Sequence, residues 1–345
     1  MENMEKKHIL VTIPLSKEQR ENLEQAARQE GAEIRFRLGE ALPSGRGGQL
    51  PFPQLLPAEL VTEEDIAWAH AILGNVQPDL LKHASQLEWM QTSSAGVEWY
   101  TRPGVLPKGA ALTNATGAYG LAISEHMLGM LLMIFKKLEL YRDAQLRREW
   151  GSQGQVRTLR GATVLVLGLG DIGGDFARLC KALGAYVIGL RRTGGEKPEF
   201  ADELCLTGEL DALLPRADVV AATLPGTPQT RGMLSRERIG RMKPGAVVLN
   251  VGRGNLIDTD ALCDALESGR LAGAGLDVTD PEPLPPEHRL WGISTAVITP
   301  HVSGGYHLWE TLDRIAGIFA ENLGYYLRGE PLRNQVDFAT GYRRR

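Results

Sequence analysis

Three glycines stand between an apolar segment and a helical one. Gly168, Gly170 and Gly173 have the spacing GxGxxG; TVLVL precedes them, and DIGGDFARLCKALG behind them has helical periodicity. In this context the first glycine permits a tight turn, the second leaves room for a pyrophosphate, and the third lets helix and strand pack closely. The N–H groups at the start of the helix can bind the anion. The pattern predicts a dinucleotide site, with a purely structural turn as the alternative.

Two arginines stand where a dinucleotide-binding unit commonly has an acid. About 20 residues past the glycines, an Asp or Glu normally accepts hydrogen bonds from the adenosine ribose of NAD. Here Arg191 and Arg192 occupy this position, at the end of the apolar VIGL, and the next acid is Glu196. A guanidinium cannot accept such hydrogen bonds, but it can bind a 2′-phosphate through two of its N–H groups. We therefore expect a preference for NADP(H). NAD(H), with solvated arginines and the ribose held by other groups, is the alternative.

An arginine, a glutamate and a histidine follow three further apolar segments. Arg253, Glu282 and His301 occur in NVGRGNLID, GLDVTDPEPLP and TPHVSGG. Each stretch begins at the carboxyl end of an expected strand, the edge at which open α/β sheets bind ligands. Arg253 could bind a substrate carboxylate and polarise a keto oxygen, while His301 donates a proton to that oxygen and a nicotinamide supplies hydride. Glu282, hydrogen-bonded to the imidazole, would keep it protonated near neutral pH. The set suits the reduction of a 2-keto acid.

Each member of this trio also has a structural alternative. An arginine after a strand is commonly in a surface ion pair, a histidine before Gly-Gly is commonly structural, and Glu282 lies in the proline-rich DPEPLPPE. Their joint occurrence at three successive strand ends, downstream of a dinucleotide turn, favours the catalytic interpretation. The remaining histidines lack this setting and are expected to be structural or exposed: His8, His70, His83, His126, His288 and His307.

Alternating strands and helices must position these residues. From residue 161 onward, strands rich in Val, Leu and Ile on both faces predict a parallel, doubly wound α/β sheet. They are expected at 161–168, 185–190, 217–225, 246–252, 271–278 and 296–301, with a helix at 171–184. The N-terminal region predicts a smaller α/β unit, which begins with a strand at 8–15 and a helix from Ser16, its N-cap, to Gly31. Further strands at 69–75 and 87–96 are each expected to lead into a helical segment.

Two longer helices and two irregular segments complete the prediction. Residues 121–140 are apolar on most faces, so one long helix there must be buried against the sheet, another domain or a second subunit. A final amphipathic helix is expected at 308–327. The Pro/Gly-rich stretch 45–57 predicts a surface loop, and the basic tail GYRRR is expected to be solvated.

Length and composition restrict the class of protein. The 345 residues are 43% hydrophobic and 23% charged, which is ordinary for a globular chain of about two domains. A formal net charge of -4 argues against nucleic acid or anionic membranes as main partners. Three cysteines without a CxxC pair predict neither a disulfide framework nor a zinc site, and we expect no metal. No signal peptide or membrane span is evident, so we expect a cytoplasmic protein.

Over nearly its whole length the sequence resembles the D-isomer-specific 2-hydroxyacid dehydrogenase family. Seven motifs in family order carry the resemblance: SSAGVEWY, LTNATGAYGLAISEHMLGMLL, VLGLGDIGG, TLPGTPQTRGML, VLNVGRGNLIDTDAL, AGAGLDVTDPEPLP and ITPHVSGG. It implies two Rossmann-like domains with the active site in the cleft between them. Residues 1–116 plus 304–345 would form the substrate-binding domain, and 117–303 the NAD(P)-binding Rossmann domain. The implied reaction is NAD(P)H-dependent reduction of a 2-keto acid to the D-2-hydroxy acid, or its reverse.

The resemblance also implies roles by position. Arg253, Glu282 and His301 match the family's catalytic trio, and Asp277 matches the residue that holds the nicotinamide amide. The implied cofactor-binding residues are Gly168, Gly170, Asp171, Ile172, Gly173, Arg191, Arg192, Leu224, Pro225, Val251, Gly252 and Asp277. The implied substrate-binding residues, besides Arg253 and His301, are Ser94, Ala95, Gly96 and Val97, whose backbone N–H groups would hold the substrate carboxylate.

Where the sequence departs from the family pattern, it indicates which branch of the family is disfavoured and which cofactor, NAD or NADP, is preferred. Arg191 stands where many members have Asp, which puts NAD in doubt rather than the reaction. Glu282 stands where the formate dehydrogenases have Gln, so that branch is disfavoured. With no extra C-terminal regulatory domain, the long, serine-regulated phosphoglycerate dehydrogenases are not expected either. Trp99 and Tyr100, just past the carboxylate loop, could favour an apolar or small substrate; among 2-keto acids the sequence does not choose.

The resemblance leaves assembly and a second function class open. Family members are generally dimers joined through the nicotinamide domain, which implies a homodimer through residues 121–150; the alternative is that this helix is only core. The second function is a dinucleotide-sensing, corepressor-like binding protein of the same fold, which would keep the same trio. The charge balance and the absence of a DNA-binding extension weigh against it.

Overall fold

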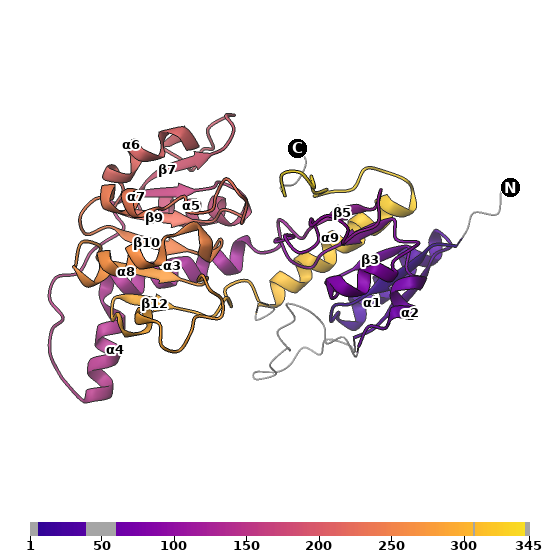
Figure 1. The fold of residues 1–345 in the computed structure, drawn as a ribbon, viewed down its shortest axis with the longest axis horizontal. Helices are drawn as coiled ribbons and strands as arrows, with labels where there is room; N and C mark the ends of the chain where they lie inside the picture. The colour runs from indigo at the N-terminus through magenta and orange to yellow at the C-terminus, as the bar shows by residue number, and fades with distance from the viewer. Residues whose placement is uncertain (1–5, 39–59, 306–307, 342–345) are drawn as a thin grey trace. The chain divides into compact units, whose positions relative to one another are not determined.

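The computed structural model describes residues 6–38, 60–305 and 308–341. The expected loop at 45–57, His307 and the arginines at 343–345 lie outside these residues. The chain divides into two compact units (Figure 1). Unit 1 comprises Met1–Tyr119 and Gly305–Arg345, and unit 2 comprises Gly120–Gly304.

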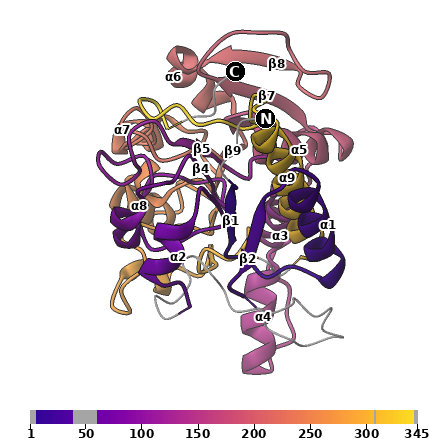
Figure 2. The ribbon, with the colours of Figure 1, turned by 90° about the vertical axis from the view of Figure 1, so that its right-hand side faces the viewer.

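Unit 1 contains a five-stranded sheet in the order β2-β1-β3-β4-β5, with every pairing parallel. Its strands are β1 (His8–Val11), β2 (Glu33–Phe36), β3 (Ala71–Leu73), β4 (Trp89–Gln91) and β5 (Ala111–Thr113). Its helices are α1 (Lys17–Gln29), α2 (Glu63–Trp68) and α9 (Trp309–Leu327). Figures 1 and 2 show α9 beside α1, so both ends of the chain build this unit.

The local signals in unit 1 are mostly confirmed. The Ser16 hydroxyl accepts a hydrogen bond from the N–H of Gln19 in a capping box, and Gly31 follows the helix with φ +72°. A 3-10 helix (Pro78–His83) follows β3 as expected. After β4 the chain makes only turns, so the helical segment expected there is wrong. The backbone carbonyls of that stretch are held instead by side chains, as described below.

Unit 2 contains a seven-stranded parallel sheet in the order β12-β11-β10-β9-β6-β7-β8. Its strands are β6 (Thr163–Leu167), β7 (Tyr186–Arg191), β8 (Glu203–Leu206), β9 (Val219–Ala222), β10 (Val247–Asn250), β11 (Gly273–Leu276) and β12 (Ala296–Ile298). Its helices are α3 (Gly120–Lys136), α4 (Leu138–Arg147), α5 (Asp171–Ala182), α6 (Leu210–Leu213), α7 (Arg236–Arg241) and α8 (Thr259–Glu267). The two parallel sheets confirm the predicted α/β fold class. Sequence reasoning missed β8, a short edge strand.

Glycines in β11 allow α3 to pack closely on the sheet. A Cβ at Gly273 would lie 2.6 Å from Cγ2 of Ile134, and one at Gly275 would lie 3.0 Å from Cβ of Met130. The two glycines are two residues apart in a strand and therefore share a face. On the other face, apolar side chains of α6, α7 and α8 form one buried cluster with the strands. Helices thus cover both faces, and the carboxyl ends of the strands remain for the loops that carry the predicted site.

The single helix expected over residues 121–140 is two helices. α3 ends at Lys136, and Lys137 adopts a left-handed conformation (φ 58°) before α4 begins. Figures 1 and 2 show α4 and the segment after it projecting from the rest of unit 2. The projecting segment is fastened by Lys137, whose Nζ donates to the Gln153 carbonyl (2.6 Å). Neither α3 nor any other helix within the described ranges is long and apolar enough to cross a membrane.

Candidate active site

The glycine turn between β6 and α5 has the shape expected for a phosphate site. Gly168 adopts φ +96°, which a residue with a side chain rarely adopts. A Cβ on Gly173 would lie 1.9 Å from the Gly168 carbonyl oxygen, so only glycine fits there. Gly170 is the N-cap of α5 without a side-chain cap, and a Cβ on it would meet no atom within 4 Å. An uncapped helix start facing open space fits a dinucleotide pyrophosphate.

Asp171 joins this turn to α3. Its Oδ2 accepts a hydrogen bond from the N–H of Gly120 (3.1 Å), the first residue of α3. The carboxylate therefore stabilises the start of a second helix, where a negative charge is favourable. Ile172, the other predicted neighbour of the pyrophosphate, lies half-buried in the first turn of α5. The predicted contacts of both residues with the cofactor stay predictions.

The loops after β6, β9, β10 and β11 contact one another in the order of the sheet. A Cβ on Gly168 would lie 2.8 Å from Cδ2 of Leu224, and one on Gly252 would lie 2.4 Å from the Leu224 carbonyl oxygen. A Cβ on Gly254 would lie 1.9 Å from the carbonyl oxygen of Thr279. These close approaches bring the dinucleotide turn, the arginine turn and the glutamate loop to one edge of unit 2.

His301 and Glu282 are in direct contact. Nδ1 of the imidazole lies 2.6 Å from Oε1 of the carboxylate, and the two side chains are 33% and 39% exposed. An ionised carboxylate can only accept, so Nδ1 carries the proton in this contact. This orientation leaves Nε2 as the nitrogen that can exchange a proton with a substrate.

Asp277 anchors the loop that carries His301. Its carboxylate, 1% exposed, accepts hydrogen bonds from Thr299 Oγ1 (2.6 Å), the Val302 N–H (2.9 Å), and the N–H and hydroxyl of Ser303. These donors use the roughly four positions at which a carboxylate accepts. The predicted contact of Asp277 with the nicotinamide amide stays a prediction, beside this observed structural role.

The turn that carries Arg253 is shaped by a residue that sequence reasoning missed. Nδ2 of Asn250 donates to the Arg253 carbonyl (2.9 Å), and its Oδ1 accepts from the Gly252 N–H (3.0 Å). Nη1 of Arg253 donates to the Gly252 carbonyl (2.7 Å). Asn250 is 1% exposed and ends β10, and Val251 beside it is 6% exposed. The sequence signal that could have identified Asn250 is an asparagine at the end of an expected strand, directly before the turn with Arg253.

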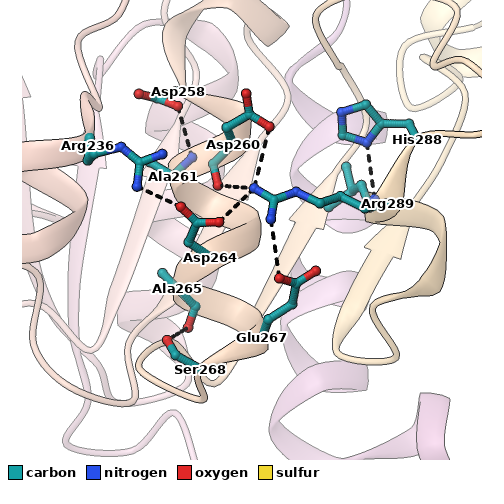
Figure 3. A network of polar contacts seen from close by, with 11 residues as sticks. Arg236, Asp258, Asp260, Ala261, Asp264, Ala265, Glu267, Ser268, His288 and Arg289 are labelled. Carbon is teal, nitrogen blue, oxygen red and sulfur yellow. Dashed lines mark hydrogen bonds and ion pairs between the residues drawn. The ribbon is translucent and has the colours of Figure 1, made fainter.

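An ion-pair network fastens the segment beyond Glu282 to α8 (Figure 3). Arg289 donates to Asp264 (2.7 Å) and Glu267 (3.3 Å), and Arg236 donates to Asp264 from the other side (2.6 Å). Hydrogen bonds from Arg236 and then Arg289 lower the pKa of Asp264, so its carboxylate stays charged. The glutamate loop therefore lies close against Gly254 at its start, and the segment beyond it is tied to α8 by Arg289.

Arg191 and Arg192 lie at the carboxyl end of β7. Arg191 is half-buried, and Arg192 is exposed. Nη1 of Arg191 lies 3.5 Å from the Glu196 carbonyl, a long hydrogen bond. Within the described residues no carboxylate forms an ion pair with Arg191. A guanidinium in this state is open to an anion.

In unit 1, the loop at residues 94–97 has its carbonyl groups engaged. The carbonyls of residues 94–96 accept from Thr92 Oγ1 (2.8 Å), Asn114 Nδ2 (2.9 Å) and the Ser94 hydroxyl (2.7 Å). The N–H groups of residues 95–97 have no hydrogen-bond partner in the part of the chain that the structure describes. Consecutive N–H groups of this kind can bind an anion.

The two aromatic residues after this loop differ in position. Tyr100 is 2% exposed, and its hydroxyl donates to the Val76 carbonyl (2.8 Å). Tyr100 therefore belongs to the core of unit 1, and its suggested influence on the substrate stays a prediction. Trp99 is 55% exposed and lies under the guanidinium of Arg102.

Comparison with known proteins identifies the family. A family model described as D-isomer specific 2-hydroxyacid dehydrogenase, NAD binding domain, matches residues 128–303, about half of the chain. The chain belongs to this family. Glyoxylate/hydroxypyruvate reductase B from Pectobacterium carotovorum is 30% identical over 295 residues, which are 83% of this chain and 89% of the relative.

Solved structures of the family cover nearly the whole chain. A D-isomer specific 2-hydroxyacid dehydrogenase family protein from Aeromonas salmonicida is 32% identical with a TM-score of 0.78, over 97% of this chain and 100% of that one. A D-isomer specific 2-hydroxyacid dehydrogenase from Xanthobacter autotrophicus, solved with NADPH and MES, is 26% identical with a TM-score of 0.76, over 97% and 99%. The resemblance is confirmed. The chain is an oxidoreductase of the 2-hydroxyacid dehydrogenase class that uses a nicotinamide dinucleotide.

Proposed function

We propose that the protein reduces a 2-keto acid to the D-2-hydroxy acid, or catalyses the reverse, with His301 as the proton donor. The 2.6 Å contact between His301 Nδ1 and Glu282 Oε1 carries this proposal. The carboxylate orients the ring so that Nε2 can give its proton to the keto oxygen.

The other predicted residues bind and orient the reactants. In unit 2, Arg253 is proposed to bind the substrate carboxylate and polarise the keto oxygen. In unit 1, the N–H groups of residues 95–97 form a group that can bind a carboxylate. We infer that unit 1 is the domain named for substrate binding in this family and that unit 2 is the NAD(P)-binding domain, in which the uncapped start of α5 receives the pyrophosphate and which also carries Arg253 and His301. When bound, the nicotinamide dinucleotide supplies the hydride.

Replacing the proton donor tests the reaction. In His301→Asn, kcat for glyoxylate and hydroxypyruvate should fall by about 10²- to 10⁴-fold, the usual contribution of a general acid. The Kd for NADPH, followed by nicotinamide fluorescence, should stay within about twofold because the glycine turn is untouched. An unchanged kcat would refute the role of His301. A wild-type protein that binds NADPH but turns over no keto acid would favour the dinucleotide-sensing binding protein.

We propose that NADP(H) is the preferred cofactor. Arg191 at the end of β7 is paired with no carboxylate within the described residues, and Arg192 follows it on the surface. The Xanthobacter relative was solved with NADPH. A guanidinium–phosphate contact contributes about 1.5–3 kcal/mol, or roughly 10- to 100-fold in affinity.

Cofactor preference is measured as kcat/KM for NADPH and NADH with the same two keto acids. The wild type should prefer NADPH by at least about tenfold. Arg191→Asp should reverse the order, because a carboxylate repels the 2′-phosphate and accepts from the ribose hydroxyls of NADH. Arg160→Asp, which changes an exposed arginine just before β6, at the opposite end of that strand from the glycine turn, is the charge control. Equal rates with both cofactors would make the arginines solvated surface charges.

We also propose a homodimer formed through residues 121–150. The projecting α4 and the residues after it expose Leu138, Tyr141, Leu146 and Trp150, the last completely. Several large, exposed apolar side chains along one projecting element favour a protein contact there. Sedimentation should give twice the 37.7 kDa chain mass, and Leu146→Glu should shift the protein toward monomer. A monomeric wild type would leave this helix as part of the surface of unit 2.

A further inference from the structure

A histidine outside the predicted trio reaches the loop that carries His301. His126 lies on α3, and its Nε2 is 3.0 Å from Oγ1 of Thr299, 173 positions away in the chain. The same nitrogen lies 3.9 Å from Oδ1 of Asp277. The His126 side chain is 26% exposed, so most of it is enclosed by its surroundings.

The direction of these hydrogen bonds follows from the number of protons available. The Thr299 hydroxyl has one proton, and it lies 2.6 Å from Asp277 Oδ1, which accepts it. Thr299 Oγ1 must therefore act as the acceptor toward His126, and Nε2 of His126 carries the proton. The chain of donors runs from His126 through Thr299 to Asp277.

This chain ends at the groups that hold His301 in place. The carbonyl of Asp277 accepts from the His301 N–H (2.8 Å), and its carboxylate accepts from the Val302 N–H (2.9 Å). His301 itself has φ 53°, in the left-handed region that residues other than glycine adopt uncommonly. The position of the imidazole therefore depends on the contacts of the loop at 299–303.

α3 is a rigid base for such a contact. It packs closely on β11 at Gly275, where an added Cβ would lie 3.0 Å from Cβ of Met130. Met130 is one helical turn beyond His126. A donor on this helix can hold the loop against the sheet, because the helix cannot move away without disturbing the packing at Gly275.

We propose that His126 is a positioning residue for the reaction. It holds the loop at 299–303, and thereby the His301 imidazole, through Thr299 and Asp277. This inference rests on the proposed role of His301 as proton donor. It assigns His126 no contact with the substrate.

Two substitutions at the same position test whether the N–H donor matters. His126→Leu keeps an apolar stem on α3 and removes the donor, whereas the side-chain amide of His126→Gln can donate from nearly the same place. Glu125→Gln, on the exposed side of the same helical turn, is the matched control. For each variant we would measure kcat and KM for glyoxylate, the Kd for NADPH, and hydrogen exchange in peptides that contain Val302 and Ser303.

We expect His126→Leu to speed exchange at Val302 and Ser303 and to lower kcat by about tenfold, because a small misplacement of a catalytic group is costly. The Kd for NADPH should stay within about twofold, since the glycine turn is separate. In His126→Gln, kcat and the exchange rate should both return most of the way to the wild-type values. Glu125→Gln should match the wild type in both. General destabilisation of the protein is not expected to lower kcat while leaving the Kd for NADPH unchanged. It is also not expected to be reversed by the hydrogen-bond donor of His126→Gln.

Three results would overturn the proposal. The first is a rate of hydrogen exchange at Val302 and Ser303 in His126→Leu that equals the wild-type rate. The second is a wild-type kcat in His126→Leu although exchange is faster. The third is an equal decrease of kcat in His126→Leu and His126→Gln. Failure of the proposed reaction gives different results. Either the wild type does not turn over keto acids, or His301→Asn retains the full turnover of the wild type. In that case the exchange data still decide: wild-type exchange in His126→Leu overturns the holding role, and faster exchange with rescue by Gln supports it.

Discussion

At Gly173, Gly252 and Gly254, the missing side chain is what lets neighbouring loops approach. A Cβ added at any of these three positions would lie within 2.4 Å of a backbone oxygen. Backbone is less able to move than the end of a flexible side chain, so these positions cannot accept alanine without a shift of the loop. Gly254 matters most for the chemistry, because Arg253 precedes it and Glu282 follows the backbone that it contacts.

Gly254→Ala should therefore impair both stability and turnover. Its Cβ would lie 1.9 Å from the Thr279 carbonyl oxygen, and overpacking of this kind costs about 1–3 kcal/mol in the free energy of unfolding. kcat should fall because the arginine turn and the glutamate loop are forced apart. Urea unfolding and steady-state kinetics measure the two effects.

The chain offers a matched control for this substitution. Gly240 lies in α7 with no atom within 4 Å of an added Cβ. Gly240→Ala should be neutral or slightly stabilising, since alanine favours helices by roughly 1 kcal/mol over glycine. Equal stability of the two alanine variants would show that the contact at Thr279 is not tight.

At the scale of elements, a buried carboxylate ties β2 to α2 in unit 1. Asp65 is fully buried and accepts from Arg35 (2.7 Å), Arg37 and the Thr62 N–H (3.1 Å). Burial alone would raise the pKa of Asp65, but the hydrogen bonds from Arg37, Thr62 and Arg35 outweigh it and lower the pKa to about 2. The charged form is therefore the one that the fold stabilises.

This shift predicts how the stability of unit 1 depends on pH. A carboxyl whose pKa falls from 3.8 unfolded to about 2 folded contributes stability that is complete above about pH 4 and is lost as pH falls through 2. The contribution is on the order of 2 kcal/mol at neutral pH. Asp65→Asn should therefore unfold more easily than the wild type at pH 7, and the difference should shrink by about 1 kcal/mol at pH 3.

Urea unfolding at pH 7, 4 and 3, followed for unit 1 by hydrogen exchange, measures this dependence. Glu64→Gln changes the exposed acid next to Asp65 and should show no such trend. A difference between Asp65→Asn and the wild type that is constant from pH 7 to pH 3 would contradict the assigned pKa.

At the scale of the whole molecule, the two units are built differently from the chain. Unit 2 is one continuous stretch, whereas unit 1 takes α9 and the residues after it from the C-terminal end. Asn322 in α9 is 0% exposed, and its Nδ2 donates to Oε1 of Gln91 at the end of β4 (2.6 Å). The Val336 N–H donates to the Leu112 carbonyl in β5 (2.8 Å). Unit 1 therefore needs both chain ends.

A chain that ends at residue 304 should consequently lose unit 1 and keep unit 2. Removing α9 exposes the apolar face of unit 1 and leaves the buried Gln91 amide with fewer partners, which is costly. Hydrogen exchange should show fast exchange throughout residues 6–38 and 60–119 and near-native protection in 120–304, with NADPH binding retained. A chain shortened only by residues 342–345 is the control. Protection of residues 6–38 and 60–119 in the shorter chain would contradict this dependence.

The sequence alone was sufficient to predict most of the helices and strands, the glycine turn, and the contact between His301 and Glu282. Apart from β8, the strands of unit 2, the glycine turn and the Ser16 cap were predicted correctly, because each depends on residues within a few positions of one another. The contact between His301 and Glu282 was predictable for another reason. The carboxyl ends of parallel strands meet at one edge, so polar residues that follow successive strands become neighbours.

Only the tertiary structure decided the remainder. Nothing in LMIFKKLEL signals that Lys137 turns left-handed, since glycine or asparagine usually occupies such a position. Asn250 was given no role from its place in NVGRGNLID, and His126 was expected only to be structural or exposed. Their roles depend on which side chain packing brings beside them, and for His126 that partner is 173 positions away. Periodicity and spacing report what a segment prefers by itself, whereas such contacts exist only after the sheet and α3 have packed together.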